Sequence, residues 1–162
     1  MQRSKERADL SVSSQVVSLL LQYEETLATL YAGCAALFPE FKAFFDELSA
    51  EEMNHAEAIK DLMAKVDGKT VFLDDNQYKV RPLEISLEYI QDVNRRIAAG
   101  ELSLLSALSS AYHIEVSAIE SDYYTIFKGD SAYLNSYLSQ LQEESEDHRD
   151  RILRMLNNLR QA

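Results

Sequence analysis

Residues 48–62, LSAEEMNHAEAIKDL, are the stretch that decides the fold predicted for this chain. Leu48 and Ile59 belong to an apolar line with helical spacing, and neither Gly nor Pro interrupts the stretch. Glu52 and His55 fall on the same line, at positions where apolar residues are expected. The stretch therefore predicts a helix that carries polar side chains on its core-facing side.

The segments on either side have the same helical periodicity. We expect helices over residues 9–38 (with Asp9 as N-cap), 39–68, 83–98, 102–127 and 131–159. The apolar lines include Val17, Leu20, Leu27, Tyr31, Cys34 and Phe38 in the first helix, and Ile85, Tyr89, Val93 and Ile97 in the short one. Residues 70–81 break the pattern and predict an irregular or extended connection.

This order of segments predicts one all-α domain over residues 1–162. Two helix pairs with short loops flank a long crossover, residues 67–101, which contains the short extra helix. Short loops make the paired helices antiparallel, and the crossover lets the second pair pack against the first. We therefore expect a four-helix bundle with one long crossover, preceded by a polar tail at residues 1–9.

Composition narrows the classes of function. The 16 Lys and Arg residues against 27 Asp and Glu residues leave a formal charge of −11, which argues against nucleic acid as a partner. The single cysteine, Cys34, excludes an intramolecular disulfide and is expected in the core. No signal peptide or membrane-spanning stretch is recognisable, so the expected location is the cytoplasm.

Polar residues interrupt the apolar lines of all four long helices. They are Glu24 in the first, Glu52 and His55 in the second, Glu115 and Asp122 in the third, and Ser145 and His148 in the fourth. Each unpaired carboxylate in a core would cost several kcal/mol. A pair of divalent metals would compensate, and Glu with neutral His suits iron, manganese or zinc. Glu52 and His55 are about 60° apart around the helix, so both can reach one site.

Other residues have weaker claims to the site. Glu25 adjoins Glu24 and would replace it after a small phase error, but the spacing to Tyr31 favours Glu24. Tyr31 and Tyr112 either donate hydrogen bonds to metal-bound carboxylates or fill the core. Asp122 either orients a ligating histidine or lies at a helix end. His113 is expected on the surface.

The constellation resembles the ferritin-like, rubrerythrin-type di-iron proteins. The motifs that carry the resemblance are Glu24 with Tyr31, Glu52-x-x-His55, Glu115, and His148. It implies that Glu24 and Glu115 are terminal ligands, that Glu52 bridges two iron ions, and that His55 and His148 each cap one. It also implies peroxide reduction or iron(II) oxidation, with peroxide or dioxygen as the small oxidant, and a homodimer is a reasonable expectation. The chain has no Cys-x-x-Cys pair, so a separate protein would donate electrons.

One position departs from the family pattern. Ser145 stands three residues before His148, where the resemblance implies a second bridging Glu. Glu144 is the best substitute, because it lies only about 40° from His148 around the helix, whereas Glu146 lies about 160° away. Alternatively, Glu115, His148, Glu52 and water hold the second metal weakly, or the chain binds a single metal.

The sequence therefore leaves more than one function open. The main hypothesis is a di-iron oxidoreductase of the peroxidase or ferroxidase type. The alternative is a ferritin-like structural or interaction protein without turnover, whose inward Glu and His residues form a salt-bridged network or a degenerate or single-metal site. Ser145 is the feature that supports this alternative.

Overall fold

The computed structural model describes residues 2–74 and 80–162, and within them the chain is mostly helical. The helices are α1 (Gln2–Leu37), α2 (Lys42–Asp67), α3 (Val80–Ala98), α4 (Leu104–Ser121) and α5 (Ala132–Gln161). Single 3₁₀ turns are η1 (Pro39–Phe41) and η2 (Tyr123–Ile126), and the strands are β1 (Phe72–Leu73) and β2 (Phe127–Lys128). The all-α prediction is confirmed at this level. No helix in the described part of the chain has the length and apolar character that crossing a membrane requires.

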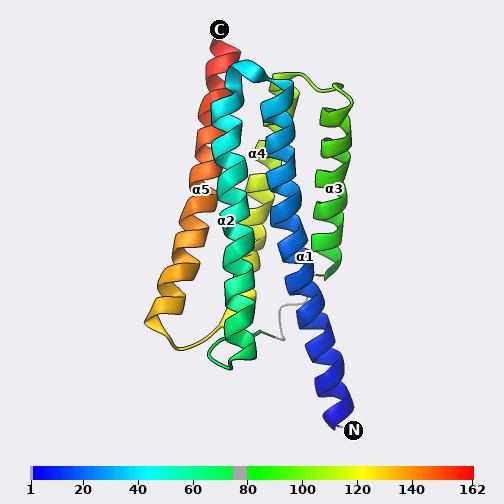
Figure 1. The fold of residues 1–162 in the computed structure, drawn as a ribbon, viewed down its shortest axis with the longest axis vertical. Helices are drawn as coiled ribbons and strands as arrows, with labels where there is room; N and C mark the ends of the chain where they lie inside the picture. Colours follow the sequence, from blue (N-terminus) through cyan, green and yellow to red (C-terminus); the bar gives the residue numbers. More distant parts are fainter. Residues whose placement is uncertain (1, 75–79) are drawn as a thin grey trace.

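The helices run side by side along the long axis of the molecule (Figure 1). α1 is antiparallel to α2, α4 is antiparallel to α5, and α3 packs on α1. Gly33 allows the close approach of α1 and α3, because a Cβ there would lie 3.1 Å from Ile97 Cγ2. Near the start of the crossover, β1 pairs with β2 in an antiparallel arrangement in which Phe72 is opposite Lys128.

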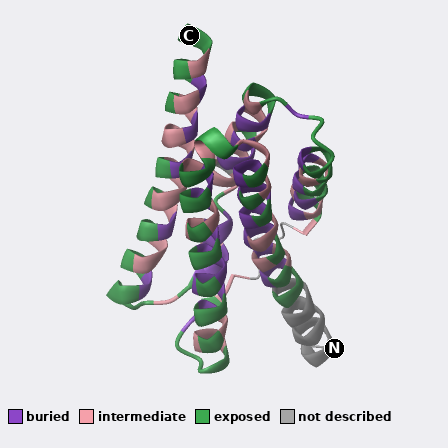
Figure 2. Cartoon of the chain, turned by 45° about the horizontal axis from the view of Figure 1, so that its top comes forward, coloured by how far each residue is buried: buried purple, intermediate pink, exposed green. Residues whose placement is uncertain are grey.

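The apolar lines of the long helices meet in one core. Buried residues follow the inward sides of the helices, whereas their outer sides are exposed (Figure 2). In α1 the predicted line is buried from Val17 to Cys34, and Cys34 is fully buried as expected. The helix ends also follow simple chemistry: Gly68 caps α2, and the Ser131 side chain accepts a hydrogen bond from the backbone of Leu134 at the start of α5.

Two predicted helix boundaries were wrong. α1 begins at Gln2, well before the expected N-cap Asp9, since no Gly or Pro among residues 2–8 stops the helix. α4 ends at Ser121 rather than at Phe127, because Asp122 adopts a left-handed conformation with φ of 48°. The chain then turns through η2, which brings Tyr123 and Tyr124 into the core.

The predicted apolar line of the short helix was also partly wrong. Ile85 and Tyr89 are exposed, and α3 instead buries Leu83, Leu87 and Ile90 together with Val93 and Ile97. A strict spacing of four residues advances about 40° per step around a helix, so such a line drifts off the buried side.

Candidate metal centre

Five ionisable residues are buried in the middle of the helices. Glu24 comes from α1, Glu52 and His55 from α2, Glu115 from α4 and His148 from α5. Each is at most 5% exposed, in a core that is otherwise apolar. Three carboxyl groups and two imidazoles at this depth need compensation, because isolated buried charges are costly. Four separate helices therefore contribute to one polar cluster.

Glu52 lies between the two histidines. Its Oε2 is 3.1 Å from Nδ1 of His55, and its Oε1 is 2.7 Å from Nδ1 of His148. The two imidazole rings stack, with centroids 5.3 Å apart. One carboxylate thus presents one oxygen to each ring, and both rings turn the same nitrogen, Nδ1, inward.

Glu24 and Glu115 each lie beside one of the two histidines. Glu24 lies 3.8 Å from Nδ1 of His55, and Glu115 lies 3.8 Å from Nδ1 of His148. Each carboxyl group also accepts a hydrogen bond from a buried tyrosine: Tyr124 donates to Glu24 at 2.7 Å, and Tyr31 donates to Glu115 at 2.5 Å. The tyrosines fix the orientation of both carboxyl groups.

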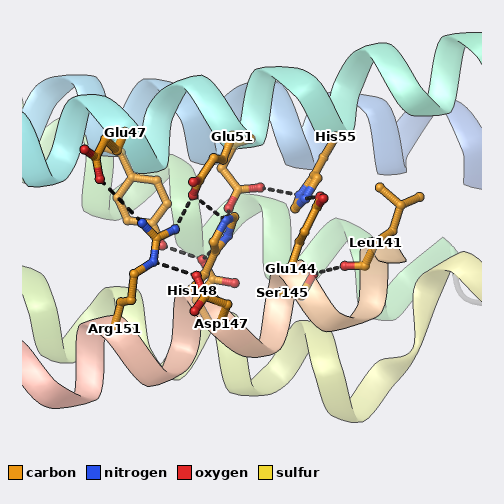
Figure 3. Close-up of polar contacts among 12 residues, drawn as sticks. Glu47, Glu51, His55, Leu141, Glu144, Ser145, Asp147, His148 and Arg151 are labelled. Carbon is orange, nitrogen blue, oxygen red and sulfur yellow. Dashed lines mark hydrogen bonds and ion pairs between the residues drawn. The ribbon is translucent and has the colours of Figure 1, made fainter. Parts of the chain in front are cut away.

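The outer ring nitrogens face a second pair of carboxylates (Figure 3). Nε2 of His55 lies 3.0 Å from Glu144, and Nε2 of His148 lies 2.8 Å from Glu51. A carboxylate on the outer nitrogen holds the proton there and leaves Nδ1 available as a metal ligand. Both histidines are therefore oriented as metal ligands commonly are, with the inner nitrogen toward the cluster.

The cluster has two related halves. In one half, His55 lies beside Glu24 and Glu144, and Tyr124 donates a hydrogen bond to Glu24. In the other half, His148 lies beside Glu115 and Glu51, and Tyr31 donates a hydrogen bond to Glu115. The helices α2 and α5 are antiparallel, and each histidine contacts a carboxylate of the other helix. His55 contacts Glu144, four residues before His148, and His148 contacts Glu51, four residues before His55. Ser145 breaks the relation. It corresponds to Glu52, but its hydroxyl donates to the backbone carbonyl of Leu141.

Burial and charge shift the pKa values of the cluster in opposite directions. Burial raises the pKa of Glu24 to about 7 and that of Glu115 to about 8. Burial acts the same way on Glu52, but the two histidines outweigh it and lower its pKa below the ordinary value. Burial alone would lower the pKa of His55, yet contacts with Glu24 and Glu52 raise it to about 11. Without metal, protons on the imidazoles thus balance the buried carboxylate.

The donor set fits a metal ion. One ligand atom each from Glu52, His55 and His148 lies within 4.8 Å of the others, so these three residues can hold one ion. Glu52 Oε1 and His148 Nδ1 are buried and lack hydrogen-bond geometry to any partner, although they lie 2.7 Å apart. Buried polar atoms without partners are costly, and coordination of a metal would satisfy both. Carboxylate oxygen and imidazole nitrogen suit several divalent metals, so the donor set does not choose among them.

One side of the cluster opens to solvent. A pocket of about 270 Å³ between α2 and α5 is lined by the two histidines and by Glu51 and Glu144. These outer carboxylates are 40% and 41% exposed, so the pocket joins the histidine edges to the surface. An acidic, open pocket attracts cations and admits a small molecule.

The cluster brings together most of the residues expected from the sequence, but not all. Tyr112 is half-buried, packs against the hydrophobic core and contacts the exposed His113, so it fills the edge of the core. Asp122 is exposed at the end of α4 rather than buried beside a histidine. Glu144 reaches the cluster, but it contacts the outer nitrogen of His55. Glu25 faces Lys60 and leaves the inner position to Glu24.

Three participants were missed. The periodicity of the sequence did not indicate Tyr124, because α4 ends at Ser121 and Tyr124 lies in the following 3₁₀ turn. Glu51 could have been found, since Glu51 and His55 repeat the spacing of Glu144 and His148. Arg151 forms ion pairs with Glu47, Glu51 and Asp147 and so holds Glu51 against His148 (Figure 3).

Comparison with known proteins identifies no relative. No protein-family model matches the chain, and no curated protein or solved structure is significantly similar to it. The geometry of the cluster is therefore the basis on which a function is inferred.

Proposed function

We propose that this protein is a dinuclear metal protein with a ferritin-like bundle, similar to rubrerythrin, that uses two iron ions to reduce peroxide or to oxidise iron(II). Glu24, Glu52 and His55 would hold one ion, and Glu115, Glu52 and His148 the other. Manganese or zinc could occupy the same ligands. In this proposal the electron donor lies outside these 162 residues, because they contain one cysteine and hence no Cys-x-x-Cys pair.

One observation carries the proposal. Glu52 presents one oxygen to the inner nitrogen of each histidine, and each histidine has its own flanking carboxyl group. A single ion held by Glu52, His55 and His148 would leave the flanking carboxyl groups Glu24 and Glu115 without a role. A carboxylate shared by two equivalent halves is what a bridged metal pair requires.

The residues around the ligands have separate tasks in this proposal. When bound, a pair of iron ions supplies two electrons to a small oxidant. Tyr124 and Tyr31 hold Glu24 and Glu115 in place, and burial raises the pKa of both tyrosines so that they remain hydrogen-bond donors. Glu144 and Glu51 orient the histidines, and the pocket beside them is the route for a small oxidant or for iron.

A second candidate function is a helical scaffold without metal. The raised pKa of His55, to about 11, favours it, because an imidazolium between carboxylates is a stable ion-pair network in itself. Ser145 also favours it, since the second bridging carboxylate is missing. The two candidates differ in metal content and in oxidant chemistry.

Anaerobic loading with iron(II), followed by peroxide or dioxygen under optical detection, separates them. The proposal predicts rapid oxidation and an absorption band from the oxidised iron pair in the wild-type protein. Glu52→Gln should lack both, whereas Glu57→Gln, on the exposed side of the same helix, should keep them. A wild-type protein that binds no iron and leaves the oxidation rate at the buffer level would overturn the proposal.

A further inference from the structure

The two halves of the cluster differ at one position that touches its centre. Glu52 on α2 fills the space between the histidines from one side. Its counterpart on α5, Ser145, has a short side chain whose hydroxyl donates to the carbonyl of Leu141, 3.0 Å away (Figure 3). The Ser145 side chain therefore turns to its own helix and offers no carboxylate at the position where the internal relation would place one.

A small cavity lies beside Ser145. It measures about 10 Å³, and its lining includes Ser145, Glu24, Glu52, Glu115 and Tyr124. That volume is about the minimum that holds one water molecule. The cavity is separate from the larger pocket, which lies on the side of Glu51 and Glu144.

Three buried carboxyl groups line the cavity together with apolar side chains such as Leu27 and Ala118. Glu52 lines it, and Oε1 of Glu52 is buried without a partner in hydrogen-bond geometry, although Nδ1 of His148 lies 2.7 Å away. Glu52 itself is only 1% exposed. A buried polar cavity of this size holds ordered water more readily than it stays empty, because water satisfies groups that are otherwise unpaired.

We propose that the cavity beside Ser145 is a binding position for one water molecule, or for a monoanion of similar size, at the place where a carboxylate on α5 would otherwise lie. This inference rests on the proposed metal centre, since three carboxyl groups would repel an anion unless metal ions offset their charge. Ser145 thereby makes one position of the centre exchangeable, whereas its counterpart at Glu52 is fixed by the protein.

The test uses cobalt(II)-loaded protein and fluoride, an anion about as large as a water molecule. Fluoride should change the visible cobalt spectrum of the wild type and of Ser145→Ala. It should leave the spectrum of Ser145→Glu unchanged, because the new carboxylate fills the cavity. Ser139→Glu adds the same charge on the exposed side of α5 and should respond as the wild type does.

The outcomes separate the two proposals. Failure to bind cobalt would overturn the metal centre itself. Bound cobalt with no fluoride response, or an equal response in Ser145→Glu, would overturn the exchangeable position alone. If Ser145→Glu does not fold, a crystal structure of the loaded wild type decides: solvent density beside Ser145 supports the inference, and its absence overturns it.

Discussion

The helices α2 and α5 contribute similar residues to the cluster but differ at one position. α2 presents Glu51, Glu52 and His55, and α5 presents Glu144, Ser145 and His148. On both helices the first Glu contacts the histidine of the other helix: Glu51 contacts His148, and Glu144 contacts His55. The middle position differs: Glu52 places a carboxylate between the inner ring nitrogens, whereas a small cavity lies beside Ser145. The comparison shows that both histidines keep the same orientation although only α2 has a carboxylate at the middle position.

Removal of Glu52 tests the comparison most severely. Glu52→Gln should abolish metal binding, because both halves share this carboxylate. The metal-free protein should also lose about 3–5 kcal/mol of unfolding free energy, since two buried imidazoles lose their common counterion. Titration calorimetry and denaturant unfolding measure the two effects. Glu57→Gln, whose carboxylate is exposed and paired with Lys60, should change neither appreciably.

Metal binding should depend steeply on pH. Contacts with carboxylates raise the pKa of His55 to about 11, so its ring is protonated at neutral pH without metal, and contact with Glu52 also raises the pKa of His148. A metal ion displaces the proton from the inner nitrogen of His55. Glu24 and Glu115, with pKa values of about 7 and about 8, also hold protons near neutral pH and would lose them to a metal. Binding should therefore release at least one proton per chain and weaken at least about 10-fold for each pH unit of acidification. Calorimetry in buffers of different ionisation enthalpy measures the proton count, and a count of zero contradicts the account.

The outer carboxylates should matter less, and unequally. Glu51→Gln should weaken metal binding about 10–100-fold, because it replaces the charged acceptor on His148 with a neutral amide and leaves the Arg151 cation near that ring. Glu144→Gln should have a smaller effect, since its neighbour Gln140 is neutral. Glu143→Gln, on an exposed position of α5, is the matched control. Equal losses at Glu51 and Glu144 would show that Arg151 has no part in the difference.

Arg151 itself should give the smallest effect. Arg151→Met removes the ion pairs to Glu47, Glu51 and Asp147, two of which involve well-exposed carboxylates. A loss of about 1 kcal/mol in unfolding free energy is expected, because partly exposed pairs contribute little. Arg154→Met, on an exposed position of the same helix, should be neutral. A loss several times larger would mean that Arg151 anchors α5 to α2.

Periodicity could predict the helices and most of the buried cluster. A Glu or His on an apolar line is conspicuous, so Glu24, Glu52, His55, Glu115 and His148 were all placed inward, and all are buried. Tyr124 could not be found this way, because its position depends on the left-handed Asp122 that ends α4. The position of Glu144 was also beyond reach. The angle between Glu144 and His148 around α5 can be derived from the sequence. The contact between Glu144 and His55 depends on how α5 packs beside α2, which the sequence does not give.

The stoichiometry of metal binding tests the central claim most directly. Metal-free protein titrated anaerobically with iron(II) should bind two ions per chain, and His55→Ala and His148→Ala should each weaken one of the two. His113→Ala, which removes an exposed histidine, should still bind two. A single ion in the wild type, lost equally in both cluster variants, would contradict the two-half centre. No bound iron would leave a metal-free ion-pair network in the core.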